Sequence, residues 1–251
     1  MKKVIVTAEI LSQEQLAPEV HKVELLAPAI AAVAQPGQFV TVAVTEQAAP
    51  LLRRPFGIAD ANKETGTITL IYRVLGPATH LLVQLLPHAT VSVMGPLGHG
   101  FNLVGKKPLL VGGGMGLAPL HFLAKSFASP VAVLMGGKTQ TELFWQSLFV
   151  GQTQYLTTDD GTLGTHGTVL ALLPKLLAEG YDSIYVCGPI PMMKAVVAEV
   201  NKTKLPCQVS LEKYMGCGLG ACLSCSCQGI GKRLKVCTDG PVFESGEVVE
   251  W

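Results

Sequence analysis

The sequence predicts an N-terminal antiparallel β-barrel, then a doubly wound parallel α/β sheet, and last a short cysteine-rich segment that ends in a hairpin. Three observations predict this arrangement. Short β runs with little helix fill residues 1–103, β and α patterns alternate over residues 104–206, and cysteines cluster within residues 207–251. A chain of 251 residues, 49% of them hydrophobic, is long enough for two compact domains and a small appendage.

Residues 1–103 have the pattern of a small barrel. Turn residues such as Gln35-Pro36-Gly37 separate the β runs, and one helical stretch, residues 79–86, interrupts them. The β runs cover residues 4–10, 21–27, 38–44, 67–74 and 90–95, with a further strand beginning near residue 54. Six or so short strands with one helix favour an antiparallel barrel.

Residues 104–206 alternate between strand and helix, starting from Lys106-Lys107-Pro108. Strand-like segments are each followed by a helix-like one. The strands are expected at 108–114, 131–137, 153–159 and 183–189, and the helices at 117–127, 142–149, 168–180 and 191–200. This alternation predicts a parallel sheet with helices on both faces. After it, a strand-like segment at 208–214 leads into the cysteine-rich loop.

Charge and hydropathy exclude several classes of protein. A net charge of +1 gives no reason to expect nucleic acid or an anionic membrane as partner. Mean hydropathy is +0.40, but prolines and glycines interrupt the uncharged run at residues 74–105, so no apolar stretch of about 20 residues is left to span a membrane. The N-terminus has the pattern of a first strand and not of a signal peptide. We expect a soluble, cytoplasmic protein whose low charged fraction, 15%, suggests a surface covered by a partner.

The cysteine spacing indicates a metal centre. Cys217-x4-Cys222-x2-Cys225, followed by Cys237, has the spacing of the plant-type [2Fe–2S] ferredoxin loop. Nearby glycines let the backbone approach a cluster closely. The alternative is a structural zinc site, since four thiolates also suit tetrahedral Zn²⁺, but zinc loops usually contain two Cys-x2-Cys pairs.

Three other cysteines complete the seven in the chain. Cys227 is interpreted as a non-ligand, because using it would break the x2 spacing. Cys187 and Cys207 lie in strand-like segments and are expected to be buried thiols.

A glycine-rich loop follows the first strand of the α/β unit and opens a helix. Its residues are Gly112, Gly113, Gly114, Met115 and Gly116. In this context, bare amides and a helix N-terminus can bind a pyrophosphate, whereas a simple turn would need only one or two glycines.

A second ligand-binding segment is predicted where the third strand of this unit ends, at Thr158, Asp159 and Asp160. Ligands of open α/β sheets bind at this edge. Two carboxylates there would repel a 2′-phosphate, which favours NAD over NADP, although the same residues could be helix caps.

The barrel holds weaker signals for phosphate binding. Arg53 and Arg54 precede Pro55, Phe56 and Gly57 where a loop becomes a strand. Arginine suits phosphate because it can make paired hydrogen bonds, and a helix N-terminus near residue 79 offers further donors. A basic strand edge facing water would look the same.

Taken together, these motifs resemble the ferredoxin reductase superfamily along the whole chain. More closely, the chain is similar to the electron-transfer subunits of NAD-linked (type 1B) dihydroorotate dehydrogenases. The resemblance is carried by LLRRPFGI, IYRVLGPATHLL, MGPLGHGF, GGGMGLAPL, CGPIPMMKA, EKYMGCGLGACLSC and VCTDGPVF, of which the last two are the most specific.

The resemblance implies which residues contact each cofactor. The residues that would contact FAD are Arg54, Pro55, Phe56, Gly57, Ile71, Tyr72, Arg73, Ala78 and Thr79. The glycine loop and Cys187, Gly188 and Pro189 would flank NAD, and Cys217, Cys222, Cys225 and Cys237 would bind the [2Fe–2S] cluster. The family usually has Ser or Thr at the position of Gly57 and Gly at that of Ala78.

The resemblance also implies a function. NAD exchanges two electrons as hydride and a cluster moves one at a time, so FAD would convert between them. The partner would be an FMN-containing catalytic subunit that oxidises dihydroorotate to orotate in pyrimidine biosynthesis, in a heterotetramer with two copies of each subunit. Alternatives are a subunit of a related ferredoxin/NAD(P) reductase, glutamate synthase or hydrogenase, or a non-catalytic iron–sulfur redox sensor. No catalytic side chain is expected in this chain itself.

Overall fold

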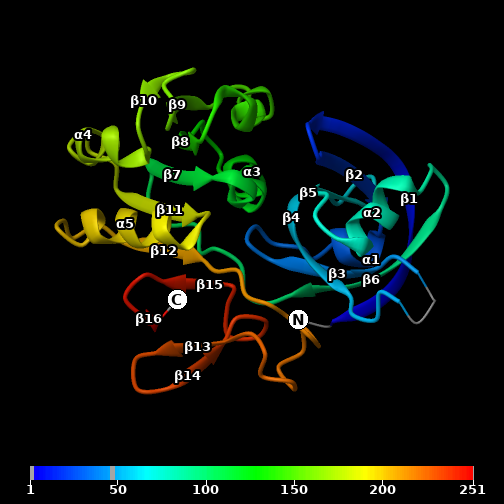
Figure 1. Ribbon diagram of the computed structural model, residues 1–251. Coiled ribbons are helices and arrows are strands. Elements are labelled where there is room, and N and C mark those ends of the chain that lie inside the picture. Colours follow the sequence, from blue (N-terminus) through cyan, green and yellow to red (C-terminus); the bar gives the residue numbers. More distant parts are fainter. Residues whose placement is uncertain (1–2, 46–48, 251) are drawn as a thin grey trace.

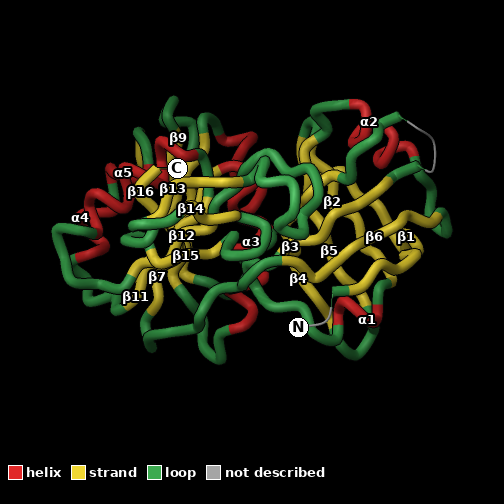
Figure 2. Tube along the Cα trace, turned by 90° about the horizontal axis from the view of Figure 1, so that it is seen from below, coloured by secondary structure: helices red, strands yellow, loops and turns green. Residues whose placement is uncertain are grey.

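The computed structural model describes residues 3–45 and 49–250. Figure 1 and Figure 2 show two lobes side by side, a β-barrel lobe and an α/β lobe, with the C-terminal segment packed beside the α/β lobe. The strand patterns of the sequence are confirmed in both lobes, and the predicted fold class is observed.

The first lobe is a closed antiparallel barrel in the order β1-β2-β5-β4-β3-β6. Its strands are β1 (Val4–Ala17), β2 (Val20–Leu26), β3 (Phe39–Ala43), β4 (Arg54–Asn62), β5 (Thr67–Arg73) and β6 (Thr90–Leu97). Side chains alternate across the barrel wall as the period of two requires. Val40 and Val42 of β3 lie in the barrel core, whereas Phe39 packs outside it, in the core under the cysteine-rich segment.

The helical content of the barrel differs from the sequence prediction. Helix α2 covers Pro77–Gln84 instead of residues 79–86. It begins earlier because Gly76 is its N-cap and Pro77 fits the first turn, and it ends earlier because Leu86 precedes Pro87, which disfavours helical backbone. The expectation of a single helix is also wrong, since the one-turn helix α1 (Pro28–Ala31) precedes β3.

The second lobe contains a seven-stranded sheet in the order β10-β9-β8-β7-β11-β12-β15. Its strands are β7 (Pro108–Gly113), β8 (Ala132–Gly137), β9 (Thr153–Thr158), β10 (Thr165–His166), β11 (Ser183–Cys187), β12 (Cys207–Ser210) and β15 (Val242–Glu244). All neighbours are parallel except β12 and β15, which pair antiparallel. The predicted strand at 208–214 is shorter than expected, because pairing ends at Ser210.

Helices cover both faces of this sheet, as predicted. The helical elements are η1 (Gly114–Gly116), α3 (Leu117–Ser126), η2 (Gln140–Ser147), η3 (Val169–Ala171), α4 (Leu173–Leu177) and α5 (Ile190–Val200). Leu110 and Val133 pack on the face that α3 and η2 cover, and Leu109 and Val111 pack on the face of α4 and α5.

Two predicted helices have a different form. The helix predicted at residues 142–149 is instead the 3₁₀ element η2, which is kinked at Leu143 (φ −95°, ψ 23°). Residues 168–180 are divided into η3 and α4, because Pro174 has no N–H to continue the hydrogen bonds of a helix and is accommodated in the first turn of α4.

The C-terminal segment forms a three-stranded sheet in the order β14-β13-β16, made of β13 (Ser226–Gly229), β14 (Arg233–Lys235) and β16 (Val248–Glu250). Its buried cysteines share one core with Phe39, Met94 and Leu97 of the barrel and with Val209 of β12. This segment therefore lies against both lobes. Over the described ranges of the chain, every helix is too short or too polar to cross a membrane.

Candidate functional site

The four cysteines selected by spacing lie in two pairs. The Cys217 N–H donates to the Cys222 Sγ at 3.4 Å, and the Cys222 N–H donates to the Cys217 Sγ at 3.5 Å. Cys225 and Cys237 are each 1% exposed, and the neighbouring Cys225 thiol is one of the causes that raise the pKa of the Cys237 thiol. The loop therefore presents one outer pair and one buried pair of thiols.

Hydrogen bonds to the sulfur atoms lower the pKa of both thiols of the outer pair. The Ser224 hydroxyl and backbone, together with Cys217, lower the pKa of the Cys222 thiol to about 6. The N–H groups of Leu219 and Cys222 lower the pKa of the Cys217 thiol, whereas burial raises the pKa of the Cys237 thiol to about 11. Hydrogen bonds to sulfur thus favour the thiolate form, which is the form that binds metal, at both outer cysteines.

This pairwise arrangement fits a two-iron cluster. Such a cluster takes two protein ligands on each iron, whereas zinc takes four around one ion. A Cβ on Gly216 would lie 3.2 Å from the Cys222 Sγ, so the loop approaches its own sulfur atoms closely.

The remaining cysteines lie in other environments. Cys227 is on β13 opposite Leu234 and is buried, and burial raises its pKa. Cys187 and Cys207 are buried, as expected from their strand context, and burial raises the pKa of each thiol to about 12.

The two arginines at the start of β4 have different surroundings. The Arg53 guanidinium donates to the Ser92 carbonyl at 2.9 Å and to the Ser92 hydroxyl at 2.7 Å, which ties this loop to β6. The Arg54 guanidinium donates only to the neighbouring Leu52 carbonyl, at 2.5 Å, among the bonds found in the described chain. Arg54 is thus the arginine that keeps donors for a phosphate.

The next residues of β4 alternate between the barrel interior and the junction of the lobes. Phe56 is partly buried and packs against the barrel core, in an edge-on contact with the Tyr72 ring at a centroid distance of 5.7 Å. Gly57 faces α3, and a Cβ there would lie 3.7 Å from the Pro119 Cδ, an ordinary contact distance. The Cβ of a serine or threonine would therefore fit at this position and would lie at the junction.

Strand β5 also presents its residues in two directions. Ile71 packs at the junction with the α/β lobe. Tyr72 is 2% exposed, its hydroxyl donates to the Gln13 Oε1 at 2.9 Å, and burial raises its pKa. The Tyr72 side chain thus packs in the barrel core, and its contact with FAD stays a prediction. Arg73 lies 3.9 Å from the Glu142 carboxylate of η2 in the other lobe.

At the start of α2, the Thr79 hydroxyl caps the helix. It accepts the N–H groups of Leu75 and Gly76 at 3.0 and 3.1 Å and bonds the Gly76 carbonyl at 3.0 Å. Ala78 is 3% exposed. Free first-turn amides, and not these two side chains, are what the helix offers an anion.

Three predicted nucleotide-binding segments meet at one edge of the parallel sheet. The glycine loop at 112–116 begins with the last two residues of β7, residues 158–160 begin at the last residue of β9, and residues 187–189 begin at the last residue of β11, all at the carboxyl ends of the strands. A Cβ on Gly116 would lie 2.5 Å from the Cys187 carbonyl carbon, so only glycine allows the loop to pack there. This is the edge at which open α/β sheets bind ligands.

The two acids at this edge have different roles. The Asp160 carboxylate accepts the Thr162 N–H at 3.0 Å and the Thr162 hydroxyl at 2.7 Å, and these bonds lower its pKa. Asp160 is therefore part of a local turn, and it is exposed. Asp159 is also exposed, and its N–H donates to the Gly137 carbonyl at 3.0 Å. Two negative charges thus lie in the solvent-facing end of β9.

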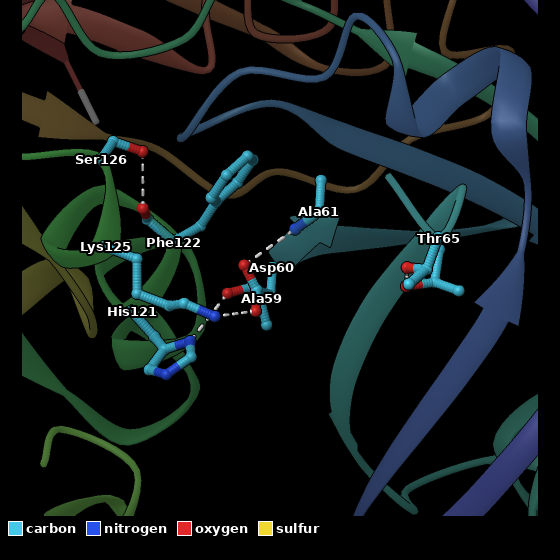
Figure 3. A network of polar contacts seen from close by, with 9 residues as sticks. Ala59, Asp60, Ala61, Thr65, His121, Phe122, Lys125 and Ser126 are labelled. Atoms are coloured by element: carbon cyan, nitrogen blue, oxygen red, sulfur yellow. Dashed lines mark hydrogen bonds and ion pairs between the residues drawn. The ribbon is translucent and has the colours of Figure 1, made fainter. Parts of the chain in front are cut away.

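Helix α3 packs against β4, whose residues 54–57 are predicted to contact FAD and which is called the flavin strand, and Figure 3 shows His121 and Lys125 of α3 facing Ala59 and Asp60 of that strand. It starts directly after η1 and lies along β4. The His121 Nδ1 is 2.9 Å from the Ala59 carbonyl, and Lys125 forms an ion pair with Asp60. One helix therefore fixes the distance between residues 54–57 and residues 112–116.

Several residues at these sites were missed by sequence reasoning. Pro119 contacts the position of Gly57, and Glu142 faces Arg73. Gly136 and Gly137 end β8 at the ligand edge of the sheet, and a Cβ on Gly136 would lie 2.7 Å from the Val169 side chain. The paired glycines at the end of a strand-like segment were a signal that could have identified this part of the edge.

A flavin-type barrel, a nucleotide-binding sheet and a cysteine loop in one chain define the class of ferredoxin-reductase-like electron-transfer proteins. Comparisons with solved structures agree. The chain matches a structure of an NADH-dependent reduced ferredoxin–NADP oxidoreductase with a TM-score of 0.87 and 30% identity, over 97% of this chain and 90% of the other. A ferredoxin NADP⁺ reductase from Neisseria gonorrhoeae, 16% identical with a TM-score of 0.63, shares the fold over 80% of this chain and 92% of its own.

Sequence comparisons give the particular family. The model of the iron–sulfur cluster binding domain of dihydroorotate dehydrogenase B matches residues 212–249. The electron transfer subunit of dihydroorotate dehydrogenase B (NAD(+)) from Geobacillus thermodenitrificans is 41% identical over 252 residues, covering 96% of each chain, and that from Desulforamulus reducens is 39% identical over 258 residues, covering 96% of this chain and 97% of its own. The chain belongs to the family of dihydroorotate dehydrogenase B (NAD(+)) electron transfer subunits.

Proposed function

We propose that this chain transfers electrons from a dihydroorotate-oxidising catalytic subunit to NAD⁺. Two electrons leave dihydroorotate as orotate forms on the partner, and NAD⁺ accepts two electrons and a proton. We further propose that the partner contains FMN, that two copies of each subunit form a heterotetramer, and that the complex is cytoplasmic. Seven free cysteines in the described chain are consistent with a reducing compartment.

One observation carries this proposal, namely that the three candidate sites are adjacent. A Cβ on Gly218 of the cysteine loop would lie 3.3 Å from the Leu97 side chain of the barrel. Gly57 of the flavin strand faces Pro119 of α3, and α3 starts at the glycine loop. An arrangement that brings cluster, flavin and nicotinamide sites together suits a relay and has no use in a protein that only binds one of them.

The residues of this chain position the cofactors. When bound, FAD exchanges hydride with the nicotinamide and single electrons with the cluster. Arg54 and the first-turn amides of α2 would bind the FAD phosphates, and residues 112–116 would bind the NAD pyrophosphate. Cys217 and Cys222 would hold one iron, and Cys225 and Cys237 the other.

The proposed sites follow the three segments of the chain. Residues 1–103 would carry FAD, residues 104–206 would carry NAD, and residues 207–251 would carry the cluster. Strands β12 and β15 of the last segment extend the sheet of the second lobe, so we expect cluster and nicotinamide sites to be rigidly connected. The cofactors would supply the redox chemistry, so we propose no catalytic side chain in this chain.

Reconstitution with the catalytic subunit from the same organism tests the function. The two purified subunits together should oxidise dihydroorotate with NAD⁺, and this chain alone should not. The chain alone should still pass electrons from NADH to ferricyanide. If the mixture does not reduce NAD⁺ while the chain couples NADH to a ferredoxin–NADP oxidoreductase partner, the related reductase function is the correct one.

Nucleotide preference should depend on the acids that end β9. The wild type should reduce its flavin far faster with NADH than with NADPH, because Asp159 and Asp160 repel a 2′-phosphate. Asp160→Ser should narrow this preference by roughly 10-fold, within the range of about 1–3 kcal/mol typical of one specificity contact. Stopped-flow reduction at matched nucleotide concentrations measures the ratio.

A matched control variant distinguishes the effect of the Asp160 charge from the effect of its hydrogen bonds within the turn. Asp160→Asn keeps an acceptor for the Thr162 N–H but removes the charge, so it should narrow the preference as Asp160→Ser does. Equal rates with NADH and NADPH in the wild type would show that Asp160 is only a turn residue.

A further inference from the structure

Thr41 of β3 has a buried hydroxyl without a hydrogen-bond partner. The residue is 2% exposed, and within the described part of the chain its Oγ1 contacts no donor or acceptor at bonding distance. Leaving such a group buried and unpaired lowers the stability of the fold. Valine has the same shape and would avoid this cost, so the hydroxyl needs an explanation.

The Thr41 side chain faces the cysteine loop. A Cβ on Gly218 would lie 3.3 Å from the Thr41 Cγ2, and the same point is 3.3 Å from Leu97 and 3.5 Å from Met94. Gly218 directly follows Cys217 and has a φ of +70°, so the loop turns sharply where it meets Thr41. The Thr41 side chain, which carries the unpaired hydroxyl, therefore packs against the loop that carries the outer thiol pair.

Thr41 also lies next to the flavin strand. In the β3–β4 register, Thr41 is the partner of Pro55, with Val42 opposite Arg54 and Phe39 opposite Gly57. Directly opposed residues of an antiparallel pair point to the same side of the sheet, and neighbouring strands are about 4.8 Å apart. Thr41 therefore occupies the barrel wall between the cysteine loop and the residues that start β4.

We propose that the Thr41 hydroxyl donates a hydrogen bond to a sulfur atom of the [2Fe–2S] cluster held by the cysteine loop, and so raises the reduction potential of that cluster. The proposal rests on the cluster assignment made under the proposed function. It explains why a donor is buried on the outer face of the barrel with no protein partner. Thr41 acts as a positioning residue, since it tunes the cluster and takes no part in the chemistry.

The effect on potential follows from charge. Reduction adds an electron to the cluster, and the sulfur atoms carry much of the negative charge. A donor that points at sulfur stabilises the reduced form more than the oxidised form, and hydrogen bonds to sulfur are among the factors that set these potentials. Removing the donor should therefore make the cluster harder to reduce.

The test compares the wild type with Thr41→Val and Thr41→Ser in the full chain loaded with iron and flavin. A redox titration, followed by electron paramagnetic resonance of the reduced cluster, gives the cluster potential, and visible absorption gives the flavin potential. Thr41→Val should move the cluster potential to a more negative value and alter the resonance signal, with iron content and flavin potential unchanged. Thr41→Ser keeps a hydroxyl and should remain close to the wild type.

A second measurement detects the proton itself. Transfer of the wild type to D₂O should change an exchangeable proton coupling in pulsed resonance spectra of the reduced cluster, and this change should be absent from Thr41→Val. Thr41→Ala also removes the hydroxyl and provides the same comparison if the valine variant is poorly folded.

Two outcomes would overturn the proposal while leaving the cluster in place. In the first, the cluster potential and the exchangeable coupling of Thr41→Val equal those of the wild type, which would mean that the hydroxyl bonds a water molecule and not the cluster. In the second, the cluster potential of Thr41→Ser shifts as far as that of Thr41→Val. A wild type without iron or a resonance signal would instead overturn the cluster assignment, and the Thr41 proposal with it.

Discussion

Replacing Cys225 with serine should remove nearly all of the iron from the purified chain, along with the visible absorption of its cluster. Cys225 is 1% exposed and contacts Cys237, so it belongs to the buried pair of ligands. A serine oxygen at this position is protonated at neutral pH and is a poor ligand for iron. We expect about two irons per chain in the wild type, as in a [2Fe–2S] protein, measured by iron and sulfide analysis with absorption spectroscopy.

Cys227→Ser is the matched control for this loss. Cys227 is two residues further along and is also buried, at 6% exposed, but it pairs with Leu234 in the hairpin. The variant should keep its iron, although burying a hydroxyl there should lower its stability by about 1–3 kcal/mol. Stoichiometric zinc in the wild type, or equal loss of iron from both variants, would contradict the ligand assignment.

Local features of the sequence were the ones that could be interpreted reliably. The spacing from Cys217 to Cys225 is local, and its glycines allow a tight loop, so the cluster segment could be recognised before the fold was known. The same holds for Gly112 to Gly116, whose strand-to-helix context was correct. Strand patterns with a period of two placed the barrel strands, and β–α alternation placed the sheet.

Helix boundaries were less predictable because single residues decide them. Apolar periodicity at residues 168–180 favoured one helix, but Pro174 divides it. The motif containing Tyr72 is predicted to contact FAD, and which of its side chains do so stays a prediction, but alternation along β5 directs the Tyr72 ring into the barrel and its hydroxyl to Gln13, which the motif alone did not indicate. A resemblance locates a motif, whereas the pleat of the strand decides which of its side chains reach the site.

Contacts between distant segments could not be predicted at all. Nothing in the sequence pairs Gly57 with Pro119, or places Thr41 under Gly218, because these contacts depend on how the lobes pack and on the register of β3 with β4. The same applies to the two thiol pairs, since spacing selects the ligands but does not say which thiols are neighbours.

Leu219→Glu should prevent assembly with the catalytic subunit while leaving flavin reduction by NADH almost unchanged. A relay to a second redox centre needs its cluster at the protein surface, within the interface. Leu219 lies between the outer ligands and is 48% exposed, and only its backbone N–H, which bonds the Cys217 Sγ, is needed by the loop. Charged residues are depleted from interface cores, and an unpaired carboxylate buried there should weaken association by about 3 kcal/mol, or roughly 100-fold.

The hairpin provides the control for this experiment. Ile230 is 69% exposed and lies at the turn between β13 and β14, whereas Cys225 and Cys237 flank the opposite ends of those strands. Ile230→Glu therefore adds the same charge to the same segment, away from the ligands, and should assemble normally.

Size-exclusion chromatography measures assembly, and the NADH–ferricyanide and NAD⁺–dihydroorotate assays measure the two activities. Loss of both activities in Leu219→Glu would indicate damage to the loop, and full dihydroorotate oxidation would place the interface elsewhere. Only loss of assembly together with dihydroorotate oxidation, with ferricyanide reduction retained, assigns the exposed face of the cluster loop to the partner.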